Sequence, residues 1–167
     1  MLVQVRFFDN KQNGHNLPKL IDLNRFTEAD IRSRLVDYGI PYNTELTVTC
    51  IADLKVKVQM SLKMAYIINK AINELYDGDT FIVSWLLQHK WTPYEVVTNY
   101  FVFETTDDEV ILNKLFSCCG KEQIVNYLVN GSTKADILSD FIRRGYLLAT
   151  PKGFYLHFKC KQSAVNA

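Results

Sequence analysis

The sequence predicts an α+β protein, in which a β-rich N-terminal part is followed by a mostly helical part ending in two helices and a β-hairpin. Residues 2–8 alternate between two faces with a period of two, which is typical of a half-buried strand. From Ser61 the period changes, and apolar residues recur at helical spacing. Near the C-terminus, the series Thr150-Pro151-Lys152-Gly153 separates two short strand-like runs and predicts a tight turn.

Residues 1–60 are the first expected part, with the element order β-α-β-β. After the opening strand, Thr27 and Asp30 have the spacing of a capping box and begin a short amphipathic helix. Residues 45–51 and 54–60 then alternate strongly between apolar and polar side chains. This alternation predicts two strands that pair as a hairpin.

Residues 61–105 are the second expected part, a mostly helical middle segment. Its first helix is followed by a second one, for which Asp79 or Thr80 is the expected N-cap. Pro93 then stands at a favourable first position of a third, short helix. Residues 100–104 are strand-like because of their aromatic and β-branched side chains.

Residues 106–161 are the third expected part, and residues 162–167 are a tail. An acidic run after Thr106 begins a helix that Gly120 ends, because carboxylates are favoured at helix N-termini and glycine after helix C-termini. Two more helices, a tight turn between them and a hairpin follow, with these expected bounds: helices 121–129 and 133–144, strands 146–149 and 154–158. Thr133 and Asp136 have the spacing of a second capping box, at the start of the second of these helices.

The third part resembles the winged helix-turn-helix family. The matching stretch, residues 122–156, reads EQIVNYLVNGSTKADILSDFIRRGYLLATPKGFYL, and residues 108–119 supply the preceding helix. The resemblance covers about a third of the chain. It implies a recognition helix over 133–144 and a wing centred on Lys152. In the DNA-binding members of the family, the helix enters the major groove and the wing touches phosphate or the minor groove.

The residues that the resemblance places at DNA are polar or basic. Basic side chains are suited to phosphates, and hydroxyl groups at a helix N-terminus can donate to backbone oxygens. The expected contacts are Ser132, Thr133, Lys134, Arg143, Arg144 and Lys152. Asp136 and Asp140 are expected on the exposed side of the same helix, where carboxylates repel phosphate. Winged helices also serve as protein-docking modules, so the family alone does not decide the partner.

The middle segment offers an alternative partner surface. It is acidic, because residues 61–119 carry a net charge of −4 whereas residues 120–167 carry +4. It also concentrates aromatic residues, which form either core or an interface with another protein. The candidate interface residues are Trp85, Trp91, Tyr94 and Tyr100. The order of its elements echoes that of the third part, so a second winged-helix-like unit is an open alternative, and so is a homodimer.

The chain lacks the motifs of a catalytic or metal site. None of the phosphate-binding, dinucleotide-binding, nucleophile-elbow or zinc-protease motifs is present. His15, His89 and His157 have no ligand or triad partner at a recognisable spacing. The four cysteines form no C-x-x-C pair, and we expect them to be reduced packing residues. We therefore expect no enzyme activity, no metal ion and no cofactor.

These observations define the functional hypotheses. The N-terminus lacks the apolar core of a signal peptide and no apolar run approaches the ~20 residues of a membrane span, so we expect a cytoplasmic protein. The leading hypothesis is a small DNA-binding or regulatory protein that uses the C-terminal winged helix on duplex DNA. The alternative is a protein-binding module or inhibitor that docks through the middle segment. Frequent lysine and asparagine suit an AT-rich bacterial, plasmid or phage genome. Within the alternative hypothesis, this composition leads us to expect a phage or mobile-element factor directed at a host system, for example an anti-defence protein.

Overall fold

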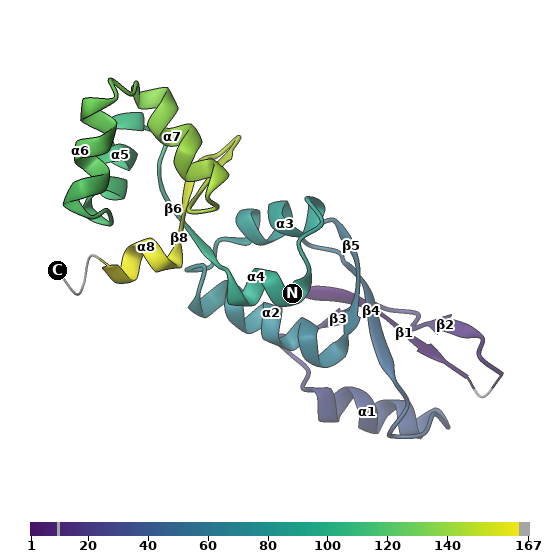
Figure 1. Ribbon diagram of the computed structural model, residues 1–167. Helices are drawn as coiled ribbons and strands as arrows, with labels where there is room; N and C mark the ends of the chain where they lie inside the picture. The colour runs from purple at the N-terminus through teal and green to yellow at the C-terminus, as the bar shows by residue number, and fades with distance from the viewer. Residues whose placement is uncertain (10, 164–167) are drawn as a thin grey trace. The chain divides into compact units, whose positions relative to one another are not determined.

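The computed structural model describes residues 1–9 and 11–163 (Figure 1). The chain divides into two compact units, of which unit 1 is Met1–Thr98 and unit 2 begins at Asn99. The predicted α+β class is confirmed, because a β-rich N-terminal part is followed by helices and by a C-terminal sheet.

Unit 1 combines an antiparallel sheet with four helices. The strand order is β2-β1-β4-β5, and β3 pairs with β1 outside this path. The elements have the following bounds: β1 Leu2–Phe8, β2 Gly14–Asn16, β3 Ile21–Asp22, α1 Glu28–Asp37, β4 Leu46–Ile51, β5 Val56–Ser61, α2 Leu62–Glu74, α3 Thr80–Gln88 and α4 Pro93–Thr98. The predicted order β-α-β-β is confirmed for β1, α1, β4 and β5, whereas β2 and β3 are additional.

Side-chain caps define where the helices of unit 1 begin. Thr27 accepts a hydrogen bond from the Asp30 backbone while the Asp30 carboxylate accepts from Thr27, so the predicted capping box is present. Ser61 caps α2 by accepting from Met64. Of the two predicted caps of α3, Asp79 is the one used, since its carboxylate accepts from the Phe81 backbone.

One face of the sheet and the helices α2, α3 and α4 form the core of unit 1. Alternate strand residues point into this core, and Val3, Val5 and Val48 are fully buried there. The helices contribute buried side chains such as Ile68 and Leu86. They lie on one side of the strands (Figure 1), so polar side chains occupy the opposite sheet face.

The described residues of unit 2 form a three-stranded antiparallel sheet in the order β6-β8-β7, together with four helices. The elements have the following bounds: β6 Phe101–Thr105, α5 Asp108–Ser117, α6 Lys121–Val129, α7 Lys134–Arg143, β7 Leu147–Thr150, β8 Gly153–His157 and α8 Phe158–Ser163. The expected helix, turn, helix and hairpin are therefore all present. Helix α8 was not predicted, and β8 ends at His157, one residue before the expected end.

The unit boundary differs from the expected boundary at residue 105. Strand β6 was expected at the end of the middle segment, but it pairs with β8, with Phe101 opposite His157. Strand pairing joins residues far apart in sequence, so local composition does not reveal it. Helices α2 and α3 contact β4 and β5 of unit 1. The helices of the expected middle segment therefore belong to unit 1, whereas its strand belongs to unit 2.

The core of unit 2 is built by α5, α7 and the sheet. Its buried residues are Ile111, Leu112, Leu115, Ile137, Leu138, Phe141, Leu147, Leu156 and Cys160. Helix α6 contributes none of these. It is held instead by half-buried Tyr127, whose ring packs near Phe116 and Phe141.

Candidate functional site

The N-terminus of α7, where the family resemblance places DNA contacts, uses its polar groups within the chain. The Thr133 hydroxyl accepts from the Asp136 backbone at 3.2 Å and donates to the Asp136 carboxylate at 2.6 Å. The same carboxylate accepts from the Thr133 backbone at 2.8 Å, which completes the predicted capping box. These bonds lower the pKa of Asp136. Ser132, just before the cap, is half-buried.

Lys134 is paired with a carboxylate from another helix. Its Nζ donates to Glu109 in the first turn of α5, and both side chains are largely exposed. This bond and the negative charge of Glu109 raise the pKa of Lys134. The acidic run that caps α5 therefore lies beside the N-terminus of α7. A phosphate at Lys134 would approach this acidic run as well.

Arg143 and Arg144 share one carboxylate, that of Asp140. Arg143 contacts Asp140 Oδ1 at 2.6 Å, and Arg144 contacts Oδ2 at 2.7 Å. The Tyr127 hydroxyl also donates to Oδ2, at 2.6 Å. The hydrogen bond from Tyr127, followed by that from Arg143, lowers the pKa of Asp140. Because one anion faces two cations, this cluster keeps one net positive charge.

Lys152 lies in the turn between β7 and β8, as the sequence predicts. Its Nζ is 5.6 Å from the centre of the Phe103 ring on β6. Its backbone N–H donates to the Thr150 hydroxyl at 3.2 Å.

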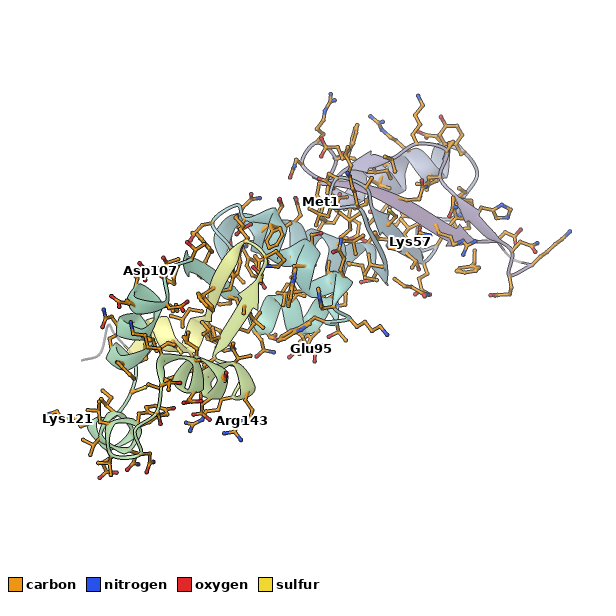
Figure 2. The ribbon with its side chains drawn as sticks, turned by 90° about the horizontal axis from the view of Figure 1, so that it is seen from above. Met1, Lys57, Glu95, Asp107, Lys121 and Arg143 are labelled. Carbon is orange, nitrogen blue, oxygen red and sulfur yellow. The ribbon has the colours of Figure 1, made fainter. Side chains whose placement is uncertain are left out.

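The predicted DNA contacts do not form one continuous basic patch. Lys134 and Arg143 stand at opposite ends of α7, about 14 Å apart along its axis at 1.5 Å per residue. Figure 2 shows Arg143 on the outer side of unit 2. Unit 2 as a whole carries eight basic and seven acidic side chains, because the segment from β6 to α5, with the N-cap of α5, brings four carboxylates into it. The +4 charge expected for the C-terminal part is thus largely offset within its own unit.

The four aromatic residues of the alternative hypothesis are divided between the two units. In unit 1, Trp85 stacks on His89 with ring centres 3.8 Å apart, and Trp91 is half-buried. Tyr94 on α4 is exposed. Tyr100 belongs to unit 2, where it stacks on Phe158 at 4.6 Å. Only Tyr94 among the four presents most of its side chain to solvent.

Helix α6 carries an exposed apolar surface that the sequence analysis did not single out. Val125, Leu128 and Val129 are 52%, 75% and 77% exposed, and their spacing of three and four residues puts them on one side of the helix. We call these three residues the α6 stripe. Both views place α6 at the margin of unit 2 (Figures 1 and 2). The sequence indicates this surface, because the apolar residues of the nine-residue helix lie on two of its sides. The core of one unit can cover only one of these sides.

The three cysteines of unit 2 are half-buried or buried. The Cys118 thiol donates to the Cys160 carbonyl at 2.6 Å. Burial raises the pKa of the Cys119 thiol and raises that of Cys160 to about 12, which disfavours the nucleophilic thiolate. In the part of the chain that the structure describes, no group of three or more His, Cys, Asp and Glu side chains is placed to hold a metal ion.

Similarity to known proteins does not assign the chain to a family. Comparisons with protein-family models, with curated proteins and with solved structures give no significant match. Among the described helices, none is both long and apolar enough to cross a bilayer.

Proposed function

We propose that the protein is a binding module that docks on another protein molecule, and that the α6 stripe is its docking surface. The observation that carries this proposal is that none of the nine residues Lys121–Val129 is buried, although five of them are large and apolar. Exposed apolar residues that are contiguous on one helix face are typical of an interaction site. An amphipathic helix that lies in an apolar groove of its partner is a common mode of recognition.

The chemistry of α6 defines the partner surface. Leu128 and Val129 are the most exposed aliphatic residues of this helix. Burying them against a partner is favourable by about 25 cal/mol per Å² of apolar area. The charges of Lys121 and Glu122 at the start of the helix cancel. We therefore expect an apolar groove without strong charge on the partner. The four free cysteines support a cytoplasmic location as part of the proposal.

The test changes the α6 stripe in the full-length protein. Leu128→Asp combined with Val129→Asp places two charges on the stripe and is expected to abolish partner retention. Asn126→Asp is the matched control, because it adds a charge to the same helix at an exposed polar position. For tagged wild type and for each variant, the cellular proteins that the tagged protein retains are quantified. The mass of each protein is measured by light scattering after size-exclusion chromatography.

The outcomes of this test are distinct. A protein retained by wild type and by the Asn126→Asp variant, but lost with the double variant, supports docking through α6. A wild-type dimer that the double variant converts to a monomer identifies a second copy as the partner. Identical retention and identical mass for all three proteins would overturn the proposal.

Duplex DNA binding by α7 and the β7–β8 turn is the second candidate function. It is favoured by Arg143, which is 80% exposed and belongs to a cluster that keeps a net positive charge. It is weakened by the pairing of Lys134 with Glu109 and by the seven carboxylates of unit 2. Fluorescence anisotropy with mixed duplex DNA over a salt series tests it. Binding that weakens with salt and disappears when Arg143 and Arg144 are both changed to Glu would support DNA binding.

A further inference from the structure

The sheet of unit 1 has an uncovered face opposite to its helical layer. A shallow hollow of about 350 Å³ lies on this face, and the residues that line it come from β1, β4 and β5. We call the following six residues the open sheet face: Arg6, Phe8, Thr47, Thr49, Lys57 and Gln59. Strand alternation produces it, because the buried Val56 and Met60 flank the exposed Lys57 and Gln59 on β5.

The cations of the open sheet face are not neutralised by the chain. Among the described residues, none forms an ion pair or hydrogen bond with the Arg6 guanidinium, and its Nε is buried without a hydrogen-bond partner. Lys57 likewise makes no ion pair with a described residue. The described lining of the hollow includes no carboxylate. This arrangement contrasts with α7 in unit 2, where carboxylates pair with Lys134, Arg143 and Arg144.

The position of Arg6 is set by its neighbours on the sheet. Its guanidinium carbon lies 5.9 Å from the centre of the Phe8 ring. Gly14 on β2 stands opposite Phe8, and a Cβ at this position would meet Arg6 Nε at 2.9 Å. The absence of a side chain at Gly14 therefore leaves room for the guanidinium beside the ring. The Phe8 side chain itself is 44% exposed, so one part of its ring remains open to a ligand.

We propose that the open sheet face binds single-stranded nucleic acid. Arg6 and Lys57 supply positive charge on strands that lie two sheet spacings apart, about 10 Å, which suits a chain of phosphates (Lys57 is labelled in Figure 2). Phe8 supplies a ring on which a base can stack. Thr47, Thr49 and Gln59 add hydroxyl and amide groups that hydrogen-bond phosphates or base edges.

Charge complementarity and shape favour this ligand over others. The hollow is open to solvent along the sheet, so a strand can lie across it. An acidic peptide would match the cations but would not need an exposed aromatic ring beside them. Base stacking on an aromatic side chain next to basic residues is the recurrent mode by which sheets bind single strands. The proposal is independent of docking by α6, because the residues concerned lie in the other unit.

The experiment is fluorescence anisotropy of the full-length protein with a labelled oligothymidine of about 16 nucleotides, near the upper site size of small single-strand-binding domains. We expect binding at about 50 mM salt that weakens as salt rises. Phe8→Ala should weaken binding by on the order of tenfold because it removes the ring. Phe8→Leu keeps an apolar side chain but also removes the ring, so it should weaken binding to the same extent. Lys57→Gln should reduce the slope of log affinity against log salt by about 0.7, the value for one phosphate of a single strand.

Matched controls separate this site from other basic groups. Lys70→Gln removes one exposed cation from α2 of the same unit, and the pair Arg143→Gln with Arg144→Gln removes the cations of α7; both should leave binding unchanged. Circular dichroism checks that each variant is folded. No binding at low salt, equal loss with the control variants, or equal binding of duplex DNA, of a free nucleotide or of polyglutamate would overturn the proposal.

Discussion

Asp140 shows how a single residue changes the interpretation of a surface. The Asp140 side chain is 14% exposed, and three side chains contact its carboxylate: Arg143, Arg144 and Tyr127. The carboxylate thus removes one positive charge from the proposed DNA side of α7 and also connects α7 to α6. A sequence shows that these residues are a helical turn apart, but it does not show that two arginines bind the same group.

Buried His157 makes the stability of unit 2 depend on pH. Burial, followed by the positive charge of Lys159, lowers the pKa of His157 below 6.5, and the Lys159 backbone donates to its Nδ1 at 3.2 Å. As the pH falls below 6.5, the unfolded chain binds a proton that the folded chain does not. We therefore expect the stability of unit 2 to decrease with falling pH in this range, until the folded imidazole is also protonated.

Thermal unfolding between about pH 5 and pH 8 measures this effect, because the range spans the ordinary pKa of histidine. His157→Gln removes the titrating group and should flatten the dependence. His89→Gln is the control, since His89 is exposed. Equal pH dependence of wild type and the His157→Gln variant would contradict the prediction.

Asp9 stabilises the loop between β1 and β2 at the residue scale. A hydrogen bond with His15 Nε2 at 3.0 Å and a bond from the Asn13 backbone lower the pKa of Asp9 to about 2. The stabilisation is complete above the ordinary value of 3.8 and is lost as the pH falls through 2. A carboxyl titration by NMR should give this low value, and it should return toward 3.8 in the His15→Ala variant.

Tyr127 is the main attachment of α6 at the scale of secondary-structure elements. Because none of the residues Lys121–Val129 is buried, the hydrogen bond from Tyr127 to Asp140 has few apolar contacts to assist it. We expect Tyr127→Phe to destabilise unit 2 by roughly 1.5 kcal/mol, the lower end of the range for a hydrogen bond to a charged group, because the bond is only half-buried. Backbone amides of α6 should then exchange faster with solvent.

The control for this prediction is Tyr94→Phe, which removes a hydroxyl from an exposed tyrosine of unit 1. It should change neither the melting temperature nor the exchange of α6. If both variants behaved alike, Tyr127 would not be the attachment of the helix.

Patterns among residues close together in the sequence predicted the helices and strands better than they predicted which charges are exposed. The caps at Thr27 and Thr133 depend on residues three positions apart, so the sequence predicted both and the structure confirms them. Strands β2 and β3 have three and two residues, and only pairing with β1 makes them strands. The pairing of Lys134 with Glu109 joins residues 25 positions apart. Such long-range contacts decide which charges remain available, and a single sequence does not reveal them.

The open sheet face was partly visible in the sequence. The alternation of residues 2–8 puts Arg6 and Phe8 on the same side of β1, as the structure confirms. The contribution of β4 and β5 depends on register, which a single sequence does not specify. Pairing places Thr47 opposite Arg6, and an irregularity between Val48 and Cys50 shifts the register with β5. The cluster is therefore a product of sheet formation.

At the scale of the whole molecule, each unit has a core of its own, so we expect the two to unfold separately. Leu115 is fully buried in unit 2, and Leu115→Ala should destabilise that unit by about 2–5 kcal/mol because it removes apolar contacts and leaves a cavity. Hydrogen exchange followed by mass spectrometry should show faster exchange in α5 and α7 but unchanged protection of β1 and β4. The converse change, Ile68→Ala in unit 1, should expose the sheet of unit 1 and leave unit 2 protected. Loss of protection throughout the chain in either variant would instead mean that the two cores unfold as one cooperative structure.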